Sequence, residues 1–158
     1  MTGCRDSATC MALLVLLTSA AWSAGADAQS SEGERLNTIE LFLGDTRSSD
    51  GSGISIGISY ERRVTPLLGI GGFVERAGGD VDSTAVAAEV VFHPHAGWSL
   101  KLSPGVEFES GDANALLRIG AAYDFEIAPN WFLAPEVNVK LVEGEKQMIY
   151  GLAIGHEF

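Results

Sequence analysis

From Thr38 to the end of the chain, hydrophobic and polar residues alternate with a period of two. In the final stretch, Tyr150, Leu152, Ile154 and Phe158 fall on one side, while the positions between them are mostly small or charged. Such alternation predicts a β-strand with one apolar face. The same parity recurs in seven upstream segments, separated by turns rich in Gly, Pro, Asp and Ser. The sequence therefore predicts an all-β fold of eight antiparallel strands joined by hairpins.

These segments are long for strands. They span Thr38–Thr46, Gly53–Arg63, Leu67–Arg76, Ser83–His93, Trp98–Glu109, Ala115–Ile127 and Trp131–Val142, and the closing strand follows Lys146 and ends at Phe158. Most reach the ~9–11 residues that a tilted strand needs to cross a membrane, rather than the ~5–6 typical of soluble proteins. We expect a single barrel over residues 38–158.

The residues on the opposite face of these strands indicate whether the apolar face contacts lipid or a protein core. This opposite face combines glycine, alanine and serine with charged residues, which are Glu40, Glu61, Arg63, Glu75, Glu89, Lys101, Glu107, Glu109, Arg118, Asp124, Glu126, Glu136, Lys140 and Glu157. So many small residues on a solvated outer face would weaken the strands. Inside a narrow barrel they leave room for long charged side chains. The pattern thus predicts an eight-stranded antiparallel up-and-down transmembrane β-barrel with a polar, side-chain-filled interior.

The N-terminal segment has the pattern of a secretory signal peptide. Arg5 precedes an apolar run that begins at Met11, and Ala26-Asp27-Ala28 provides a small-residue cleavage site. The run is shorter than the ~20 residues of a transmembrane helix. We expect residues 1–28 to be removed and residues 29–37 to form a loose lead-in.

Composition narrows the chemistry of the mature chain. Its 158-residue precursor has only Cys4 and Cys10, both in the segment expected to be removed, so neither a disulfide nor a thiolate metal site is expected. Cleavage removes one basic and two acidic residues and changes the formal charge from −11 to −10. Such an acidic chain repels nucleic acid. The sequence indicates no cofactor.

Connections and aromatic residues predict the orientation. Turns after the second, fourth and sixth strands are short and contain Pro66, Pro94 and Pro129, whereas the other connections are acidic. Short periplasmic turns are typical of outer membrane barrels, so both termini are expected in the periplasm. Outward aromatic residues gather at the same end and predict a periplasmic girdle of Tyr60, Phe92, Trp98, Tyr123, Phe125, Trp131 and Phe158.

With its signal peptide, eight alternating strands, short turns and terminal aromatic strand ending in Phe158, the chain resembles small outer membrane β-barrels of the OmpA transmembrane-domain and OmpX type. The resemblance covers the whole mature chain and is one of pattern. It implies that Tyr150 and Phe158 form the signal read by the outer membrane assembly machinery. It also implies a monomer surrounded by outer membrane lipids and lipopolysaccharide.

Interior charges are expected to pair, because an unpaired buried charge costs several kcal/mol. Folding each hairpin about its turn places Glu89 opposite Lys101 and Glu107 opposite Arg118, and Glu136 and Lys140 join the same set of structural lumen ion pairs. A small pore is the alternative use of these charges, although eight strands generally leave no aqueous channel.

Two further readings remain as alternatives to a non-catalytic structural or surface-interaction protein. Lipid A-modifying barrels use His, Ser and a carboxylate near the rim, but none of His93, His95 and His156 has a serine two residues on. A soluble periplasmic lipocalin-like barrel requires a hollow apolar interior, which the charged face does not supply.

Acidic loop residues could also bridge lipopolysaccharide phosphates through Ca²⁺ or Mg²⁺. They are Asp45, Asp50, Asp80, Asp82, Glu143 and Glu145, and they lack the ligand spacing of a dedicated loop. We therefore expect no metal site.

Overall fold

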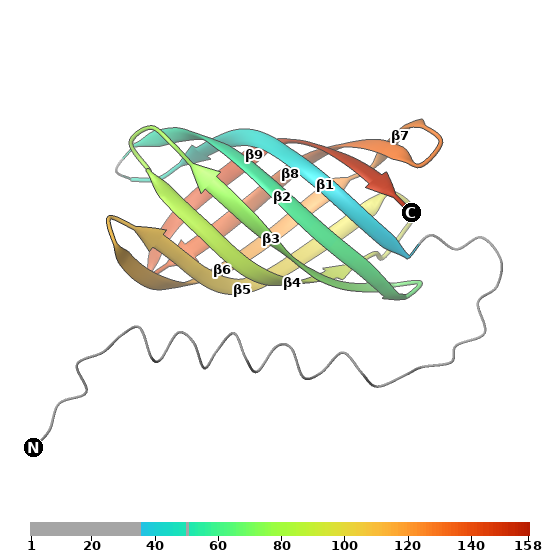
Figure 1. Cartoon of the computed structure of the whole chain (residues 1–158), viewed down its shortest axis with the longest axis horizontal. Coiled ribbons are helices and arrows are strands. Elements are labelled where there is room, and N and C mark those ends of the chain that lie inside the picture. Colours follow the sequence, from blue (N-terminus) through green and yellow to red (C-terminus); the bar gives the residue numbers. More distant parts are fainter. Residues whose placement is uncertain (1–35, 50) are drawn as a thin grey trace, which may run out of the picture. The chain divides into compact units, whose positions relative to one another are not determined.

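The computed structural model describes residues 36–49 and 51–158, which form a β-barrel (Figure 1). The expected signal peptide lies outside the described residues, as does the lead-in up to residue 35. Asn37, placed at the end of the lead-in from sequence, instead opens the first strand. No helix in the described ranges is long and apolar enough to cross a membrane.

Nine strands account for most of the described chain. They are β1 (Asn37–Arg47), β2 (Ser52–Thr65), β3 (Leu68–Ala77), β4 (Ser83–Phe92), β5 (Trp98–Glu109), β6 (Asp112–Tyr123), β7 (Phe125–Ala128), β8 (Trp131–Val142) and β9 (Glu145–Glu157). Each strand except β7 has at least ten residues. That length is enough for a tilted strand to cross a bilayer.

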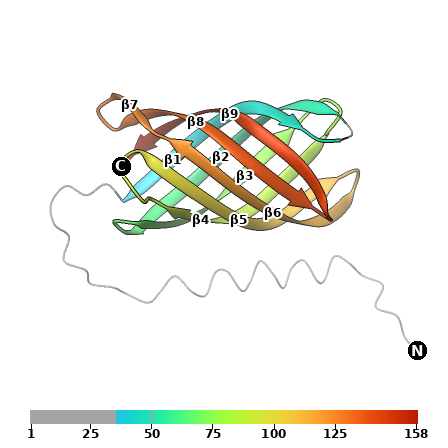
Figure 2. The same cartoon turned by 180° about the vertical axis from the view of Figure 1, so that it is seen from behind.

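The eight long strands form a closed ring, and the short β7 has a partner on one side. Strands that are neighbours in sequence pair antiparallel, except β6 and β7, and the ring is closed by the pairs β1–β9 and β6–β8. Because β6 and β7 are successive parts of one wall position, the ring has eight positions, as predicted from the sequence (Figures 1 and 2). Closure satisfies the backbone hydrogen bonds that an open sheet would leave unpaired.

One predicted strand, Ala115–Ile127, is interrupted at Asp124. The register of β6 and β7 against β8 places Tyr123 opposite Pro135. Proline has no N–H to donate to the ladder, which accounts for a break at this point. Trp98, the first residue of β5, pairs with Tyr123, so β5 does not reach beyond the break and β7 continues along β8 alone (Figure 2).

The two faces of the wall have the predicted parity. A continuous apolar outer belt is formed by exposed residues from every long strand, for example Leu43, Ile56, Val74, Val90, Leu102, Ile119, Val137 and Leu152. The interior holds the buried charges together with two apolar clusters, one around Phe132 and one around Phe73. An apolar surface that surrounds a barrel far exceeds the patches that soluble monomers expose.

Interior glycines provide room for polar side chains. A Cβ atom on Gly120 would lie 1.9 Å from Oδ1 of Asn138, and one on Gly69 would lie 1.9 Å from Oε1 of Glu61. Both distances are far below van der Waals contact, so even alanine at these positions would displace a lumen side chain.

The two ends of the barrel do not differ in connection length as the sequence suggested. At the end that carries the termini, here called the terminal end, the connections are residues 66–67, 93–97 and 129–130. At the opposite end, the loop end, they are 48–51, 78–82, 110–111 and 143–144. The expectation of shorter turns at the terminal end is therefore wrong, because the strands extend into residues that were read as loop. Acidic connections still distinguish the loop end.

Candidate functional site

The lumen contains ion pairs that join strands across the barrel. Nζ of Lys101, on β5, lies 2.8 Å from Glu40 on β1 and 3.1 Å from Glu136 on β8. β1 and β5 occupy opposite positions of the eight-position ring. Lys101 and Glu136 are buried, and Asn138 donates a further hydrogen bond to Glu136 at 2.8 Å. This layer therefore connects opposite walls.

A second layer is centred on Arg118 of β6. Its Nη1 donates to Glu75 of β3 at 2.9 Å, and its Nη2 lies 3.8 Å from Glu89 of β4. The guanidinium carbon also lies 3.5 Å from the ring centroid of Phe73, which is cation–π geometry. Ser103 donates to Glu89 at 2.7 Å. One arginine thus serves two buried carboxylates.

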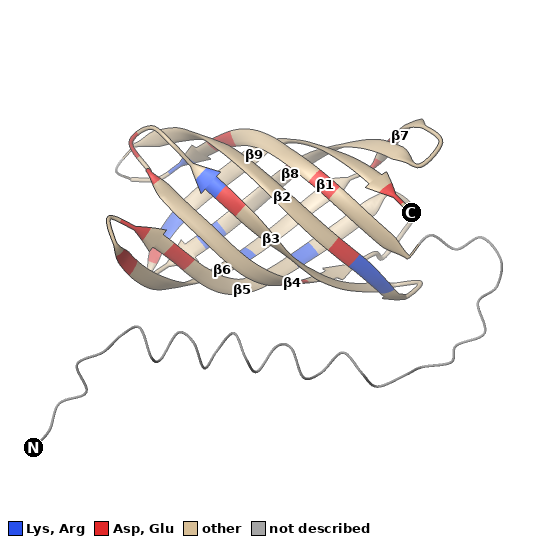
Figure 3. Cartoon of the chain, viewed as in Figure 1, with Lys and Arg blue, Asp and Glu red and all other residues tan. Residues whose placement is uncertain are grey.

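A third layer, nearer the loop end, joins Lys140 of β8 to Glu107 of β5. Their side chains are 1% and 0% exposed, the most buried pair of opposite charges in the described barrel. Ser83 donates to Glu107 at 3.1 Å, and Gln147 donates to it at 3.4 Å. Figure 3 shows the acidic and basic positions distributed along the wall strands.

All six residues expected in lumen ion pairs lie inside, but the two specific pairings are wrong. Lys101 faces Val91 in the β4–β5 ladder, and Arg118 faces Ser103 in the β5–β6 ladder. Long side chains in a narrow lumen point toward the axis, so they reach strands two to four positions away rather than the hairpin neighbour. Glu40 and Glu75, which take part in these layers, were placed on the lumen face but assigned no partner.

A polar network lies at the terminal end. His93 Nε2 and Glu61 Oε1 are 2.8 Å apart, and Nη2 of Arg63 lies 3.2 Å from both ring nitrogens of His93. Arg63 Nε is 3.8 Å from the same Glu61 oxygen. Arg63 is therefore already engaged by Glu61 and His93.

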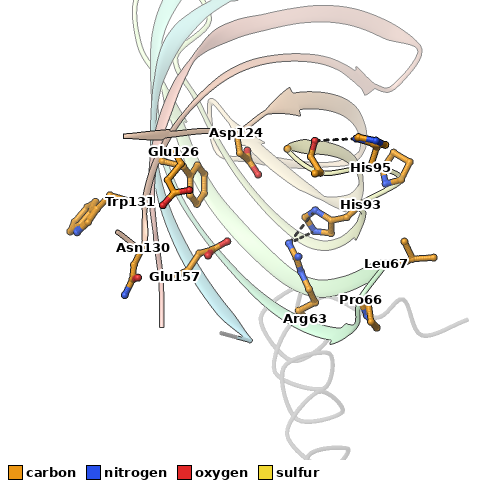
Figure 4. Close-up of a pocket in the computed structure, with 14 residues that line it drawn as sticks. Arg63, Pro66, Leu67, His93, His95, Asp124, Glu126, Asn130, Trp131 and Glu157 are labelled. Atoms are coloured by element: carbon orange, nitrogen blue, oxygen red, sulfur yellow. Dashed lines mark hydrogen bonds between the residues drawn. The ribbon is translucent and has the colours of Figure 1, made fainter. Parts of the chain in front are cut away.

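A cavity of about 420 Å³ opens beside this network (Figure 4). We call it the mouth pocket. It is lined by Arg63, Pro66, Leu67, His93, Pro94, His95, Ala96, Gly97, Asp124, Glu126, Asn130, Trp131, Phe132 and Glu157. A smaller space of about 10 Å³ lies among an overlapping set of residues that adds Thr38, Glu40, Glu61 and Ser99. The lining residues of the mouth pocket come mainly from the β4–β5 turn, the β7–β8 hairpin and the end of β9.

Asp124 lies in that break, outside both strands. Its backbone N–H donates to the carbonyl of Gly97 at 2.7 Å, which fixes the position of the break. Burial of the carboxyl group, followed by repulsion from Glu40, raises the pKa of Asp124 to about 6. The side chain thus holds a negative charge that its surroundings do not fully compensate.

The aromatic residues expected in a girdle lie near the terminal end. Trp98 contacts Tyr123 with ring centroids 5.2 Å apart, and Tyr123 contacts Phe125 at 4.7 Å. Trp131 packs against His156 at 4.6 Å. Phe92 is exposed at the end of β4, and Tyr60 donates to Asn37 at 2.8 Å.

Phe158 lies at the seam between the first and last strands. Its N–H donates to the carbonyl of Asn37 at 2.8 Å, and its carbonyl accepts from the Asn37 N–H at 3.1 Å. The ring is exposed and stacks near His156. Tyr150 lies elsewhere on β9, toward the loop end, where its hydroxyl donates to Asp45 at 2.8 Å.

Comparison with known proteins identifies the architecture. The N-terminal β-barrel domain of OprF from Pseudomonas aeruginosa superposes with a TM-score of 0.57 at 18% identity, covering 80% of this chain and 100% of that one. The fold is that of the small eight-stranded transmembrane β-barrels. Ail of Yersinia pestis gives a TM-score of 0.55 at 17% identity over 80% of this chain and all of its own. Neisserial surface protein A gives 0.53 at 15% identity over 77% of this chain and 96% of its own. No protein-family description and no curated protein sequence matches the chain.

The three histidines lie in different surroundings, and no metal-binding cluster is found among the described residues. Within residues 36–49 and 51–158, no group of three or more His, Cys, Asp or Glu side chains is arranged to hold a metal ion. His93 contacts a carboxylate and an arginine, His95 contacts a backbone carbonyl, and His156 packs on aromatic rings.

The mouth pocket is the feature that sequence reasoning missed. The residues Asp124, Glu126 and Glu157 were read as ordinary lumen-facing charges on continuous strands. Pro135 is the residue that indicates the interruption in the sequence, since a proline within a strand often marks a break in the hydrogen-bond ladder. Its partner could be found only once the register between β6 and β8 was known.

Proposed function

We propose that this protein is a non-catalytic outer membrane β-barrel with a structural or surface-interaction role. The observation that carries the proposal is the pairing of a continuous apolar outer belt with a buried, ion-paired interior. A soluble protein has the opposite arrangement. The expected partners are outer membrane lipids and lipopolysaccharide around the barrel, with the assembly machinery acting through the last strand.

Fractionation tests this proposal. Cells that express the full chain should hold the mature protein in the outer membrane fraction, with gel mobility that changes on heating. Recovery of a soluble periplasmic protein whose mobility does not depend on heating would overturn the proposal and favour the lipocalin-like alternative.

The proposed orientation places both termini and the mouth pocket in the periplasm and the acidic loop end outside the cell. The outward aromatic residues at the terminal end support it, because such residues anchor barrels at membrane interfaces. An epitope inserted at Gly111, whose φ is +93° in an open turn, should be accessible on intact cells. The same epitope after Phe158 should become accessible only on permeabilised cells. The reverse pattern would show the opposite orientation.

A pore is the less favoured function. Lys101, Arg118 and Lys140 each reach across the lumen to a carboxylate on another strand, which supports a filled interior. Purified protein in planar bilayers should therefore give no conductance above background. Discrete conductance steps would make the pore reading the better one.

A further inference from the structure

One arginine on the outer face of the barrel has no counter-charge. Arg62 lies near the terminal end of β2 and is exposed. Its neighbours across the two ladders are Asn37 on β1 and Ile70 on β3, and neither is charged. The adjacent carboxylate of Glu61 is buried on the lumen side of the wall. Among the described residues, Arg62 has no ion pair and no side-chain hydrogen bond.

The two other arginines on the described outer face are both neutralised by the protein itself. At the loop end, Nε of Arg47 donates to Asp45 at 3.0 Å, and Arg76 pairs with Asp82. The carboxylates at the terminal end do not take this role, because they line the mouth pocket rather than the outer face: Asp124, Glu126 and Glu157. The counter-charge of Arg62 therefore has to come from outside the described barrel.

Arg62 lies at the level where lipid headgroups are expected. Tyr60, the girdle residue on β2, precedes it by two positions, which is about 7 Å along an extended strand. The headgroup layer of a bilayer extends ~5–8 Å beyond the hydrocarbon core on each side. A long basic side chain at such a position keeps its stem on apolar surface and its charged group in the polar layer. The guanidinium of Arg62 thus reaches the phosphates of the surrounding leaflet.

The surface beside Arg62 suits a hydrocarbon chain. Ile70, its neighbour on β3, is an exposed apolar residue. Toward the middle of the barrel, the next outward positions on β3 and β4 are Gly72 and Ala88, which pair with each other, and Gly72 also lies opposite Tyr60. These two small residues leave space beside the tyrosine ring. An unpaired cation and an apolar surface are therefore adjacent, as the two ends of a phospholipid require.

We propose that Arg62 binds the phosphate group of an anionic phospholipid in the leaflet that surrounds the terminal end. The planar guanidinium can donate two parallel hydrogen bonds to phosphate oxygens. An acyl chain of the same lipid lies over Ile70 and the small residues beside it. A free phosphate ion would lack this second, hydrophobic contact. The inference rests on the proposed membrane location, since lipid reaches Arg62 only if the apolar outer belt lies in a bilayer.

Dioleoyl phosphatidylglycerol is the probe that tests the proposal. The purified barrel in dodecyl maltoside micelles, a detergent without phosphate, should show amide shifts at Asn37, Arg62 and Ile70 that saturate as the lipid fraction of the micelle rises. Arg62→Gln should weaken the apparent affinity about fivefold, which corresponds to ~1 kcal/mol for one arginine at an anionic membrane surface. Lys146→Gln is the matched control, because Lys146 is an exposed cation at the loop end without a partner among the described residues, and it should leave these shifts unchanged.

Dioleoylglycerol has the same acyl chains but no phosphate, and it should not saturate these shifts. The proposal is overturned if phosphatidylglycerol fails to saturate them, if dioleoylglycerol saturates them at the same lipid fraction, or if Arg62→Gln binds like the unmodified protein. An equal loss of affinity in Lys146→Gln would also overturn it, because net charge alone would then explain the binding. Heat-modifiable mobility confirms that each variant is folded. Failure of this measurement on purified protein leaves the proposed outer membrane location intact, whereas a soluble protein on fractionation would refute that location directly.

Discussion

Replacing Lys140 by methionine should destabilise the barrel strongly, because it leaves the carboxylate of Glu107 buried without a cation. The two side chains are 1% and 0% exposed, so water cannot solvate the remaining charge. Breaking a buried pair by removing one partner typically costs about 3–5 kcal/mol. Because Ser83 and Gln147 still donate hydrogen bonds to Glu107, we expect Lys140→Met to cost about 3 kcal/mol of stability, near the lower end of that range.

Removing the charge of Glu107 instead should lower the stability more. Lys140 has no second carboxylate among its contacts in the described structure, so Glu107→Gln leaves an ammonium group without a counter-charge. We expect about 4 kcal/mol for that variant. The double variant should lose much less than the sum of about 7 kcal/mol, because each single variant leaves one charge buried without a partner and the double variant leaves none.

Urea unfolding in lipid vesicles, followed by tryptophan fluorescence, measures these differences. Lys146→Met is the matched control, because Lys146 is exposed on the adjacent strand β9, and it should change stability by less than about 0.5 kcal/mol. The reasoning fails if Lys140→Met costs less than about 1 kcal/mol, or if the double variant equals the sum of the single variants.

Three further predictions concern other parts of the barrel. Asp124→Asn should stabilise the protein by about 1 kcal/mol near pH 7.5 and should have no effect near pH 4. The folded-state pKa of about 6 exceeds the unfolded value of 3.8, so ionisation of Asp124 lowers the stability as pH rises between these values. Partial exposure of the side chain to solvent in the mouth pocket reduces the size of this effect. Equal effects at both pH values in urea titrations would contradict this. Ile58→Arg, on the outer face midway along β2, should cost about 2–4 kcal/mol in vesicles, whereas a change within about 0.5 kcal/mol would argue against lipid contact. Deletion of Phe158 should lower the heat-modifiable fraction in the outer membrane, because it removes the last backbone pairing with Asn37 and the proposed assembly signal, and an unchanged fraction would reject that role.

Parity was enough to predict which side chains face inward. Lys101, Glu107 and Arg118 all lie in the interior, as the alternation with apolar neighbours such as Leu102 and Ile119 required. The period of two allows no third option once one face is assigned to lipid. The eight-position ring follows from the same repeat.

Contacts across the lumen could not be predicted in the same way. A hairpin turn sets which residues face each other on adjacent strands, but it says nothing about side chains that meet near the axis. Lys101 contacts Glu40, which is 61 residues away in the sequence, because the strand stagger brings β1 and β5 to the same height. That stagger is a property of the closed ring and not of any one hairpin.

Strand ends were misjudged for a related reason. Asp112 and Asn114 were read as loop because they are polar, yet they pair with Glu109 and Glu107 in the β5–β6 ladder. Backbone hydrogen bonding continues where the side chains stop alternating. Polarity therefore marks where a strand leaves the apolar belt and not where it ends.

The link from Lys101 to Glu40 also has a mechanical consequence. A thin-walled cylinder flattens easily into an elliptical cross-section, and a contact between opposite walls opposes this flattening. Lys101 and Glu40 join opposite sides of the ring and thereby resist ovalisation of the cross-section under lateral pressure from the bilayer. No ion pair in the described mouth joins opposite walls in this manner, since Arg63, His93 and Glu61 all lie on β2 or just beyond β4. We therefore expect the barrel to change shape most readily at the terminal end.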